Sequence, residues 1–274
     1  MLNQRWLIRG DVRLLAVHHR PAEPVPVGAA VLWAGFSHPM CDADYFMSKL
    51  ARQLAAGGLF VAQVDPRGHG DSSGDFADVD LDTLREDIAL ALDHYQARFP
   101  EGLLCIGRGL AAPLLAEAAA GRDLAGVAGV APYFLPTGAV PPAGNAAPAD
   151  AAELFPGRDY TGHSDFAEPA LCLLNALGTV PYNLHGMRVS PRLLQGLASF
   201  DALAALRRIS PACALWLVQD ERDPDAAAAL RLDDSMPAPR LAAYRRPLLP
   251  RNPAFHRTAI SRLAEWALDR CALA

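Results

Sequence analysis

The sequence lacks the features that would direct it to nucleic acid, to metal or to an oxidising compartment. Its net charge is only −5 over 274 residues, and a pI of about 5.9 gives no electrostatic case for nucleic acid or an anionic membrane. The five cysteines are scattered and odd in number, which argues against a disulfide framework or a zinc site and favours a reducing compartment. We therefore expect no metal and no other cofactor.

Long apolar runs are also missing. The first residues, MLNQRWLIRGD, contain no apolar core of signal-peptide length. No stretch reaches the roughly 18 uninterrupted apolar residues of a membrane span, so we expect a cytoplasmic protein. The chain does contain 51% hydrophobic and 20% charged residues, enough apolar surface for one large α/β core with or without an insertion.

Short apolar runs alternate with amphipathic segments in the first half, as in a parallel sheet flanked by helices. Two runs around the turn Arg9-Gly-Asp11 predict an opening antiparallel hairpin. The fold class expected is α/β, with about eight mostly parallel strands. Strands are predicted at 5–8, 14–17, 29–34, 59–64, 103–106, 127–131, 214–218 and 241–244, and helices at 42–54, 81–99, 111–120 and 258–273.

The pattern breaks between Pro132 and Pro191, where nine prolines exclude long regular elements. The aromatic and leucine content of this segment argues against a disordered linker. We interpret residues 132–191 as a cap inserted over the carboxyl ends of the strands, into a core formed by residues 1–131 and 192–274. Short helical pieces are predicted at 167–177 and 193–206.

One turn has the outline of a catalytic elbow without the catalytic residue. Cys105-Ile-Gly-Arg-Gly-Leu-Ala-Ala112 lies between a predicted strand and helix, where the motif G-x-S-x-G presents a serine on a strained turn. In that register the nucleophile position is Gly109, which has no side chain to form an acyl-enzyme. Glycine does suit the strained backbone of such a turn. The alternative interpretation is an ordinary strand-to-helix turn.

Backbone and side-chain groups beside this turn are candidates for ligand binding. Trp33-Ala-Gly-Phe-Ser37 occupies the place of an oxyanion loop. The backbone N–H groups of Phe36 and Leu110 are predicted to face the position where an oxyanion forms, and would still bind a carbonyl or carboxylate without a nucleophile. Arg108 is a candidate clamp for an anionic group.

A second loop follows the strand at 59–64 and reads Val64-Asp-Pro-Arg-Gly-His-Gly-Asp-Ser72. Its glycines turn the chain, and Asp65 and Arg67 are predicted to hold neighbouring loops. His69 is interpreted as part of this scaffold rather than as a catalyst.

Candidates for the other catalytic roles are weaker. Asp223 lies where the carboxylate of a triad would follow a strand, but it is equally explained as the cap of a helix. His256, between the last strand and the last helix, is the candidate base, although no nucleophile would be served by it. His38 and Cys41 are candidates for an improvised pair, and Asp42 is interpreted as a helix cap.

Residues 29–120 and 208–266 resemble the α/β-hydrolase superfamily. The resemblance is closest to the "hydrolase 2" proteins encoded with bacterial exosortase A systems, which accompany exopolysaccharide and protein-sorting loci. It rests on Ser37-His-Pro-Met40, on Gly70-Asp-Ser-Ser-Gly-Asp-Phe-Ala77 and on an elbow without serine. That family reads G-L-R-L-G at the elbow, whereas the arginine here is shifted by one. Its Pro-Phe-Trp segment resembles Pro253-Ala-Phe-His256, which implies that His256 replaces an aromatic residue and is no triad base.

Two functions follow from these patterns. The first is a pseudoenzyme with a degenerate elbow, which binds a small acyl or carbonyl ligand or a partner protein in a bacterial pathway. The second is an active esterase, thioesterase or lyase that uses His38, Cys41, Asp223 and His256. A purely structural role is neither favoured nor excluded.

Overall fold

The structure is a computed structural model. It describes residues 2–36, 38–41, 45–130, 132, 182–184, 187–218, 241–243 and 253–273.

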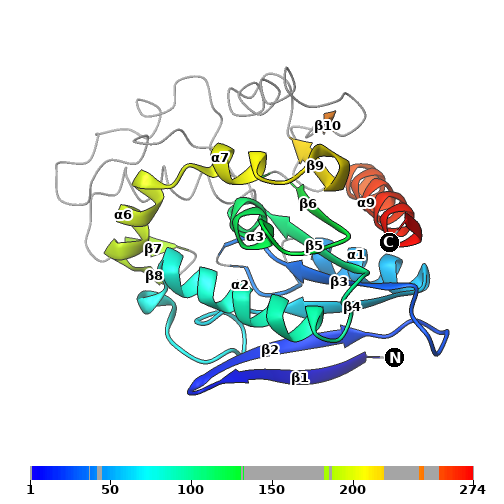
Figure 1. The fold of residues 1–274 in the computed structure, drawn as a ribbon. Helices are drawn as coiled ribbons and strands as arrows, with labels where there is room; N and C mark the ends of the chain where they lie inside the picture. The colour runs from blue at the N-terminus through cyan, green and yellow to red at the C-terminus, as the bar shows by residue number, and fades with distance from the viewer. Residues whose placement is uncertain are drawn as a thin grey trace.

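The described strands form one eight-stranded sheet in the order β1-β2-β4-β3-β5-β6-β9-β10, and a separate pair β7-β8 (Figure 1). In the large sheet β2 runs antiparallel to both of its neighbours, and the other neighbouring pairs are parallel. The predicted α/β sheet with an opening hairpin is therefore confirmed. The strands are β1 (Leu2–Arg9), β2 (Val12–His19), β3 (Gly28–Trp33), β4 (Leu59–Val64), β5 (Leu103–Arg108), β6 (Gly126–Val130), β7 (Tyr182–Leu184), β8 (Met187–Val189), β9 (Ala214–Val218) and β10 (Leu241–Ala243).

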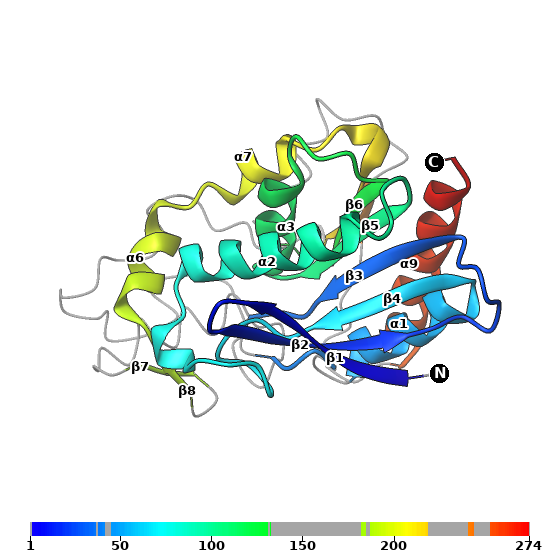
Figure 2. The same cartoon turned by 60° about the horizontal axis from the view of Figure 1, so that its bottom comes forward.

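Helices cover both faces of the large sheet, α2 and α3 on one and α1 and α9 on the other (Figures 1 and 2). Two buried apolar clusters separate these layers, and the strands contribute alternate residues to each: Val31 and Cys105 to the α2 side, Leu32 and Ile106 to the α1 side. The helices are α1 (Phe46–Ala56), α2 (Leu81–Gln96), α3 (Ala111–Ala119), α6 (Pro191–Ser199), α7 (Ala202–Arg207) and α9 (Pro253–Leu273), with short 3₁₀ turns η2 (Phe76–Asp78) and η3 (Pro211–Cys213).

Local hydrogen bonds fix where several helices begin. At α2, the Asp80 carboxylate accepts the Thr83 N–H and the Thr83 hydroxyl accepts the Asp80 N–H, both at 2.8 Å, which is a capping box. Ser190 caps α6, whose first residue is a proline. Asp201 caps α7 by accepting the Ala204 N–H at 2.8 Å. Such caps satisfy N–H groups that a helix leaves unpaired at its start.

Three predicted boundaries were wrong. Helix α1 begins at Phe46 rather than at residue 42, and its N-cap residue is Tyr45, with a φ of +58° and no side-chain cap bond. Asp42, the predicted helix cap, lies outside the described residues. The predicted helix at 193–206 is two helices, because the backbone is extended at Phe200 and Asp201 starts α7. Helix α9 begins at Pro253 rather than at Thr258, since proline suits the first helical turn.

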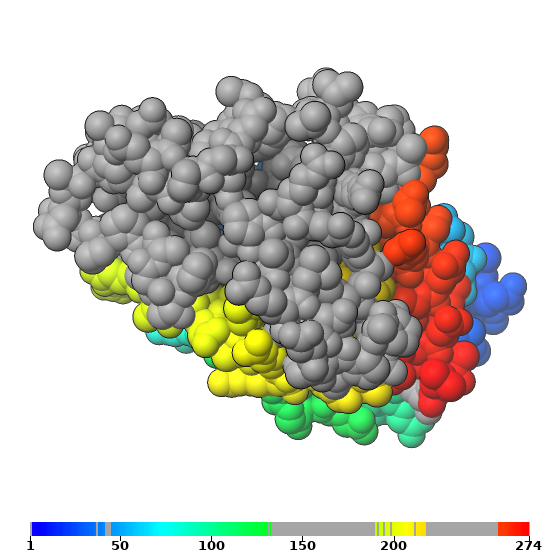
Figure 3. All heavy atoms as spheres, turned by 90° about the horizontal axis from the view of Figure 1, so that it is seen from above, coloured from blue at the N-terminus to red at the C-terminus, as the bar shows by residue number. Residues whose placement is uncertain are grey.

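The described part of the predicted cap consists mainly of the strand pair β7-β8. The pair β7-β8 and helix α6 lie at the end of the molecule toward which the parallel strands point (Figures 1 and 2). Seen from above, α7 (yellow) and α9 (red) lie along different margins of the molecule (Figure 3). Most of residues 132–191 lie outside the described residues, so the domain boundaries stay a prediction.

A buried histidine on β2 predicts how stability depends on pH. The His18 side chain packs edge-on against Phe60, its Nε2 lies 2.7 Å from the Tyr95 hydroxyl, and burial together with the nearby Arg98 lowers its pKa from 6.5 to about 4. A depressed pKa contributes stability that is complete above pH 6.5 and is lost as the pH falls toward 4. The loss corresponds to about 3 kcal/mol for one such group.

We therefore expect the stability difference between the wild type and His18→Gln to shrink by about 3 kcal/mol between pH 7 and pH 4. Urea unfolding at a series of pH values measures it. His94→Gln, on the exposed side of α2, is the control and should change the slope much less. An unchanged His18→Gln difference across this range would mean that His18 titrates with the same pKa in the folded and the unfolded protein.

Candidate functional site

Sheet register brings three loops together at one edge. Trp33 is paired with Val64 and with Gly107, and Arg108 is paired with Val130. The segments that follow β3, β4 and β5 therefore leave the sheet at the same level. In open α/β sheets this edge, beyond the carboxyl ends of the strands, is where ligands bind.

Gly109 forms the turn between β5 and α3 and has a φ of +56°. Its N–H donates to the Val130 carbonyl at 3.0 Å, and its own carbonyl accepts the Ala112 N–H at 3.2 Å. This backbone conformation lies in the left-handed region, which side chains other than glycine enter at a cost. The expected strand–turn–helix geometry is therefore present at the predicted position.

Glycines on β5 and β6 let α3 lie directly on the sheet. A Cβ on Gly107 would lie 2.7 Å from the Leu115 Cδ1 and 2.9 Å from the Ala111 carbonyl carbon. A Cβ on Gly129 would lie 2.7 Å from the Ala112 Cβ. The first turn of α3 is thus held against the strands that flank the elbow, which fixes the direction of its leading N–H groups.

The loop after β3 is tied to β4 at Met40. The Met40 N–H donates to the Asp65 carboxylate at 2.5 Å, and the Met40 carbonyl accepts from the Gln63 amide at 2.7 Å. Burial raises the pKa of Asp65 to about 6, although its bond to the Met40 N–H works in the opposite direction. The N–H and the carbonyl of Met40 are therefore both fixed to residues at the end of β4.

Gln63 is a positioning residue that sequence reasoning missed. Besides binding Met40, its side-chain oxygen lies 2.6 Å from the His19 Nε2, so it links β2, β4 and the loop after β3. The available signal was a polar residue in the otherwise apolar and fully buried strand LFVAQV. A buried amide of this kind needs partners for both of its ends.

The two predicted oxyanion donors lie on the segments that follow β3 and β5. Leu110 directly follows Gly109 at the start of α3. The Phe36 ring packs against His69 and Phe76, with centroids 5.8 and 5.0 Å away. Within the described part of the chain, neither the Phe36 nor the Leu110 amide N–H donates a hydrogen bond. The joint role of the two groups as oxyanion donors remains a prediction.

His69 belongs to the scaffold, as predicted. It is buried, its Nδ1 lies 2.9 Å from the Arg67 carbonyl oxygen, and it packs edge-on against Phe76 at 5.0 Å. Burial, with a smaller effect from the nearby His38, lowers the pKa of His69 to about 4. A neutral, enclosed imidazole stabilises the loop and does not need to exchange protons.

Asp65 and Arg67 hold neighbouring segments, which confirms that prediction. Asp65 fixes the loop after β3, as described, and Arg67 binds helix α2. The Arg67 Nε and backbone N–H each donate to the buried Asp87 carboxylate at 2.7 Å. A further guanidinium bond reaches the Thr83 carbonyl at 3.0 Å.

Arg108 is buried rather than exposed at the elbow. It is the last residue of β5, is only 7% exposed, and its guanidinium lies 5.6 Å from the centre of the Phe46 ring on α1. A cation over an aromatic face is a stabilising arrangement. The guanidinium therefore sits on the α1 side of the sheet, and its predicted role as an anion clamp remains a prediction.

The other catalytic candidates come from three separate segments of the chain. His38 and Cys41 are half-buried in the loop that Met40 anchors. Asp223 lies outside the described residues, five positions after the end of β9. His256 lies in the first turn of α9 and not in a loop before the helix, which corrects its predicted setting. In the described ranges no group of three His, Cys, Asp or Glu residues is placed to hold a metal ion.

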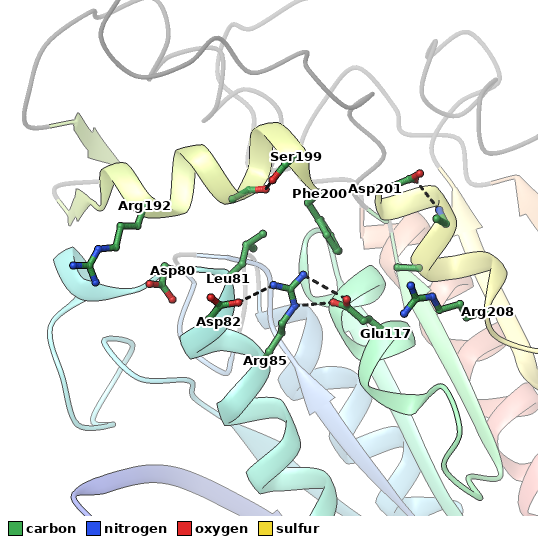
Figure 4. Close-up of a pocket in the computed structure, with 13 residues that line it drawn as sticks. Asp80, Leu81, Asp82, Arg85, Glu117, Arg192, Ser199, Phe200, Asp201 and Arg208 are labelled. Carbon is green, nitrogen blue, oxygen red and sulfur yellow. Dashed lines mark hydrogen bonds and ion pairs between the residues drawn. The ribbon is translucent and has the colours of Figure 1, made fainter.

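A separate groove of about 490 Å³ lies between the start of α2, α3 and the helices α6 and α7 (Figure 4). At its centre Arg85 binds Asp82 and Glu117, both at 2.9 Å, and stacks over Phe200 at 5.6 Å. None of the residues that line the groove belongs to the loops around Gly109. The charged side chains at its centre form ion pairs with one another. The groove is therefore a different kind of site from the loops around Gly109.

The order of the eight strands, with helices on both faces and a strand–turn–helix at Gly109, defines an α/β-hydrolase fold. The family model of the serine aminopeptidases of family S33 matches residues 33–170, half of the chain, and the protein belongs to this family. No curated protein sequence matches the chain. None of the helices in the described ranges combines the length and apolar character that a membrane span needs.

Solved structures with the same fold cover nearly the whole chain. The α/β hydrolase GrgF from Penicillium sp. sh18 has a TM-score of 0.69 at 17% identity, with 99% of both chains covered. The ferulic acid complex of Est1E from Butyrivibrio proteoclasticus has a TM-score of 0.68 at 13% identity, covering 98% of this chain and 99% of the other. A lipase in its open form has a TM-score of 0.70 at 19% identity, with 99% of both chains covered. At these identities the likeness shows the fold alone.

Proposed function

We propose that this protein is a non-hydrolytic member of its family that binds a small acyl or carbonyl ligand, or a partner protein, at the carboxyl ends of its strands. The observation that carries the proposal is Gly109. It occupies the turn between β5 and α3 with a φ of +56°, where the fold presents a nucleophile, and it has no reactive side chain. Without a nucleophile no acyl-enzyme forms.

Retained backbone donors support a binding role. The N–H groups of Phe36 and Leu110 belong to loops that the Met40 contacts and the close packing of α3 hold in place. Donors fixed in this way stabilise a developing or resident negative charge on oxygen. A carboxylate or carbonyl group is the ligand chemistry that suits them.

The resemblance to the exosortase-associated "hydrolase 2" proteins supports a place in a bacterial biosynthetic or export pathway. It rests on short motifs, of which Gly70-Asp-Ser-Ser-Gly-Asp-Phe-Ala77 is the longest. The predicted cap over residues 132–191 would close the pocket and would set the size of the ligand.

Ligand chemistry tests the proposal directly. Titration calorimetry with hexanoate and with hexanol separates recognition of the carboxylate from simple burial of the alkyl chain. We expect the carboxylate to bind more tightly, because its negatively charged oxygens accept stronger hydrogen bonds from N–H donors than a neutral hydroxyl does. Equal affinity for the acid and the alcohol, or binding of neither, would remove the support for an acyl site.

Catalysis provides the second test, with Gly109→Ser as the central variant. We expect no reaction of the wild type with fluorophosphonate probes, since these need an activated serine. Gly109→Ser should cost about 1–3 kcal/mol of stability, because serine enters a left-handed conformation, and should give no efficient hydrolysis of p-nitrophenyl esters. Gly109→Ala is the matched control for the strain. Rapid turnover by Gly109→Ser would show that a base and an acid still serve this position.

The alternative is an active esterase, thioesterase or lyase that uses His38, Cys41, Asp223 and His256. The observation in its favour is that the loop carrying His38 and Cys41 is fixed to β4 on both sides of Met40. Ester turnover by the wild type that is abolished by Cys41→Ala or His38→Ala would establish this alternative in place of the binding function.

A further inference from the structure

We propose that the free edge of strand β1 pairs with the β1 strand of a second copy of this chain, which makes the protein a homodimer. In this arrangement the two eight-stranded sheets continue into one across a twofold axis at Trp6. The proposal is independent of the site around Gly109, since β1 lies at the opposite margin of the sheet from β6, β9 and β10.

Strand β1 is a long edge strand that neither a bulge nor a proline protects, and its two charges, Arg5 and Arg9, lie on the face that also bears Leu7. Its eight residues pair with β2 in unbroken register from Leu2–His19 to Arg9–Val12, so no bulge twists the edge away, and the strand contains no proline. At the other margin of the sheet the edge strand β10 has only three residues. Natural proteins shorten, bulge or charge such edges unless they are paired.

The exposed side chains of β1 form an apolar row. Leu2, Trp6 and Ile8 are 67%, 48% and 62% exposed, and strand alternation places them on the same face. Helix α2 packs against the opposite face of the strand, which bears the buried Leu7. Several large apolar side chains in one exposed row mark an interaction surface more often than a solvated one.

Backbone hydrogen bonding points outward at the same residues. The two-residue turn at Gly10 and Asp11 closes on the pair Arg9–Val12, so Arg9 and every second residue before it bond to β2. The N–H and C=O groups of Gln4, Trp6 and Ile8 therefore face away from the sheet. Each of these residues offers one donor and one acceptor to a neighbouring strand.

Charge selects the register of the pair. A twofold axis at Trp6 places Trp6 opposite Trp6, Gln4 opposite Ile8 and Arg5 opposite Leu7. Each residue whose N–H and C=O groups face outward is then opposite a residue whose N–H and C=O groups also face outward, so the two can form hydrogen bonds. An axis at Arg5 would instead place two arginines directly opposite each other, which is destabilising. Isologous contacts of this type close on themselves and give a dimer rather than a filament.

The oligomeric state of the full chain tests the proposal. Light scattering during gel filtration is expected to give twice the monomer mass of 29.2 kDa for the wild type. Trp6→Lys should give the monomer mass while its circular dichroism spectrum stays that of a folded protein. Val25→Lys is the matched control, since Val25 is 77% exposed but lies outside β1, and it should remain dimeric. A monomeric wild type, or a Trp6→Lys variant that stays dimeric, would overturn the proposal.

A cysteine pair checks the register and does not depend on the solubility of the lysine variant. The double variant Gln4→Cys/Ile8→Cys is expected to form an intermolecular disulfide under mild oxidation, because directly opposed residues of a hydrogen-bonded pair have Cα atoms about 5.5 Å apart. Each single variant serves as a control and should not cross-link through β1. Cross-linking through Arg5→Cys, with none through the 4–8 pair, would overturn the Trp6-centred register.

Discussion

Arg67→Met is expected to lower the free energy of unfolding by about 3–5 kcal/mol, one of the two largest losses expected from a single substitution in this protein. The Asp87 carboxylate is 1% exposed and receives two bonds from Arg67, one from the guanidinium and one from the backbone N–H. Methionine keeps the backbone bond and most of the side-chain volume. It leaves a buried carboxylate without its counter-charge, and that is the costly state.

An exposed ion pair provides the comparison. Arg9 binds Asp93 at 2.9 Å with both side chains about half exposed, so Arg9→Met should cost no more than about 1 kcal/mol. Urea unfolding of both variants at neutral pH measures the difference. The double variant Arg67→Met/Asp87→Leu should recover part of the loss, because it removes the unpaired charge as well. Equal losses for Arg67→Met and Arg9→Met would show that the Arg67–Asp87 pair is solvated.

The scaffold role of the loop that carries Arg67 is one feature that the sequence predicts correctly. Asp65, Arg67 and the glycines between Val64 and Ser72 form a short motif with several local contacts. The Ser72 hydroxyl donates to the Asp65 carbonyl, and the Gly68 N–H donates to the Ser73 carbonyl. Local geometry of this kind is encoded by residue type and spacing. The scaffold roles of this loop could therefore be predicted from sequence, as could the mostly parallel sheet implied by alternating apolar runs.

The sequence does not predict which side chains contact each other when they are far apart along the chain. The role of Gln63 depends on His19 and Met40, which are 44 and 23 positions away. The direction of Arg108 depends on Phe46 of α1. Periodicity identifies each strand, but it does not indicate which polar side chain a distant loop will contact.

Helix boundaries failed for a more local reason. The predicted start of α9 at Thr258 is wrong, because the helix begins at Pro253, and at the first helical position the missing N–H of proline costs nothing. The consequence for function is direct, because His256 then belongs to a helical turn. A base in a triad is normally presented by a loop that can direct the imidazole toward the nucleophile, so its helical setting favours the non-hydrolytic proposal.

Gly68→Ala is the other substitution with a large expected effect, a loss of about 3–5 kcal/mol from steric overlap and backbone strain together. Gly68 has a φ of +71°, and a Cβ there would lie 2.6 Å from the Phe76 nitrogen and 2.7 Å from the Phe76 Cα. Those neighbours are backbone atoms of η2 and cannot rotate away. The strain alone is measured by Gly121→Ala, where φ is +84° and nothing lies within 4 Å of the new Cβ.

We expect Gly121→Ala to cost only about 1–2 kcal/mol, the ordinary penalty of a left-handed conformation for alanine. The additional loss in Gly68→Ala then measures the contact between the loop after β4 and η2, on which the enclosure of His69 and Phe36 depends. The same variant should weaken hexanoate binding, if it folds, because the Phe36 N–H moves with its ring. Thermal and urea unfolding of the two variants side by side decide the matter, and a Gly68→Ala loss no greater than that of Gly121→Ala would show that the two segments separate freely.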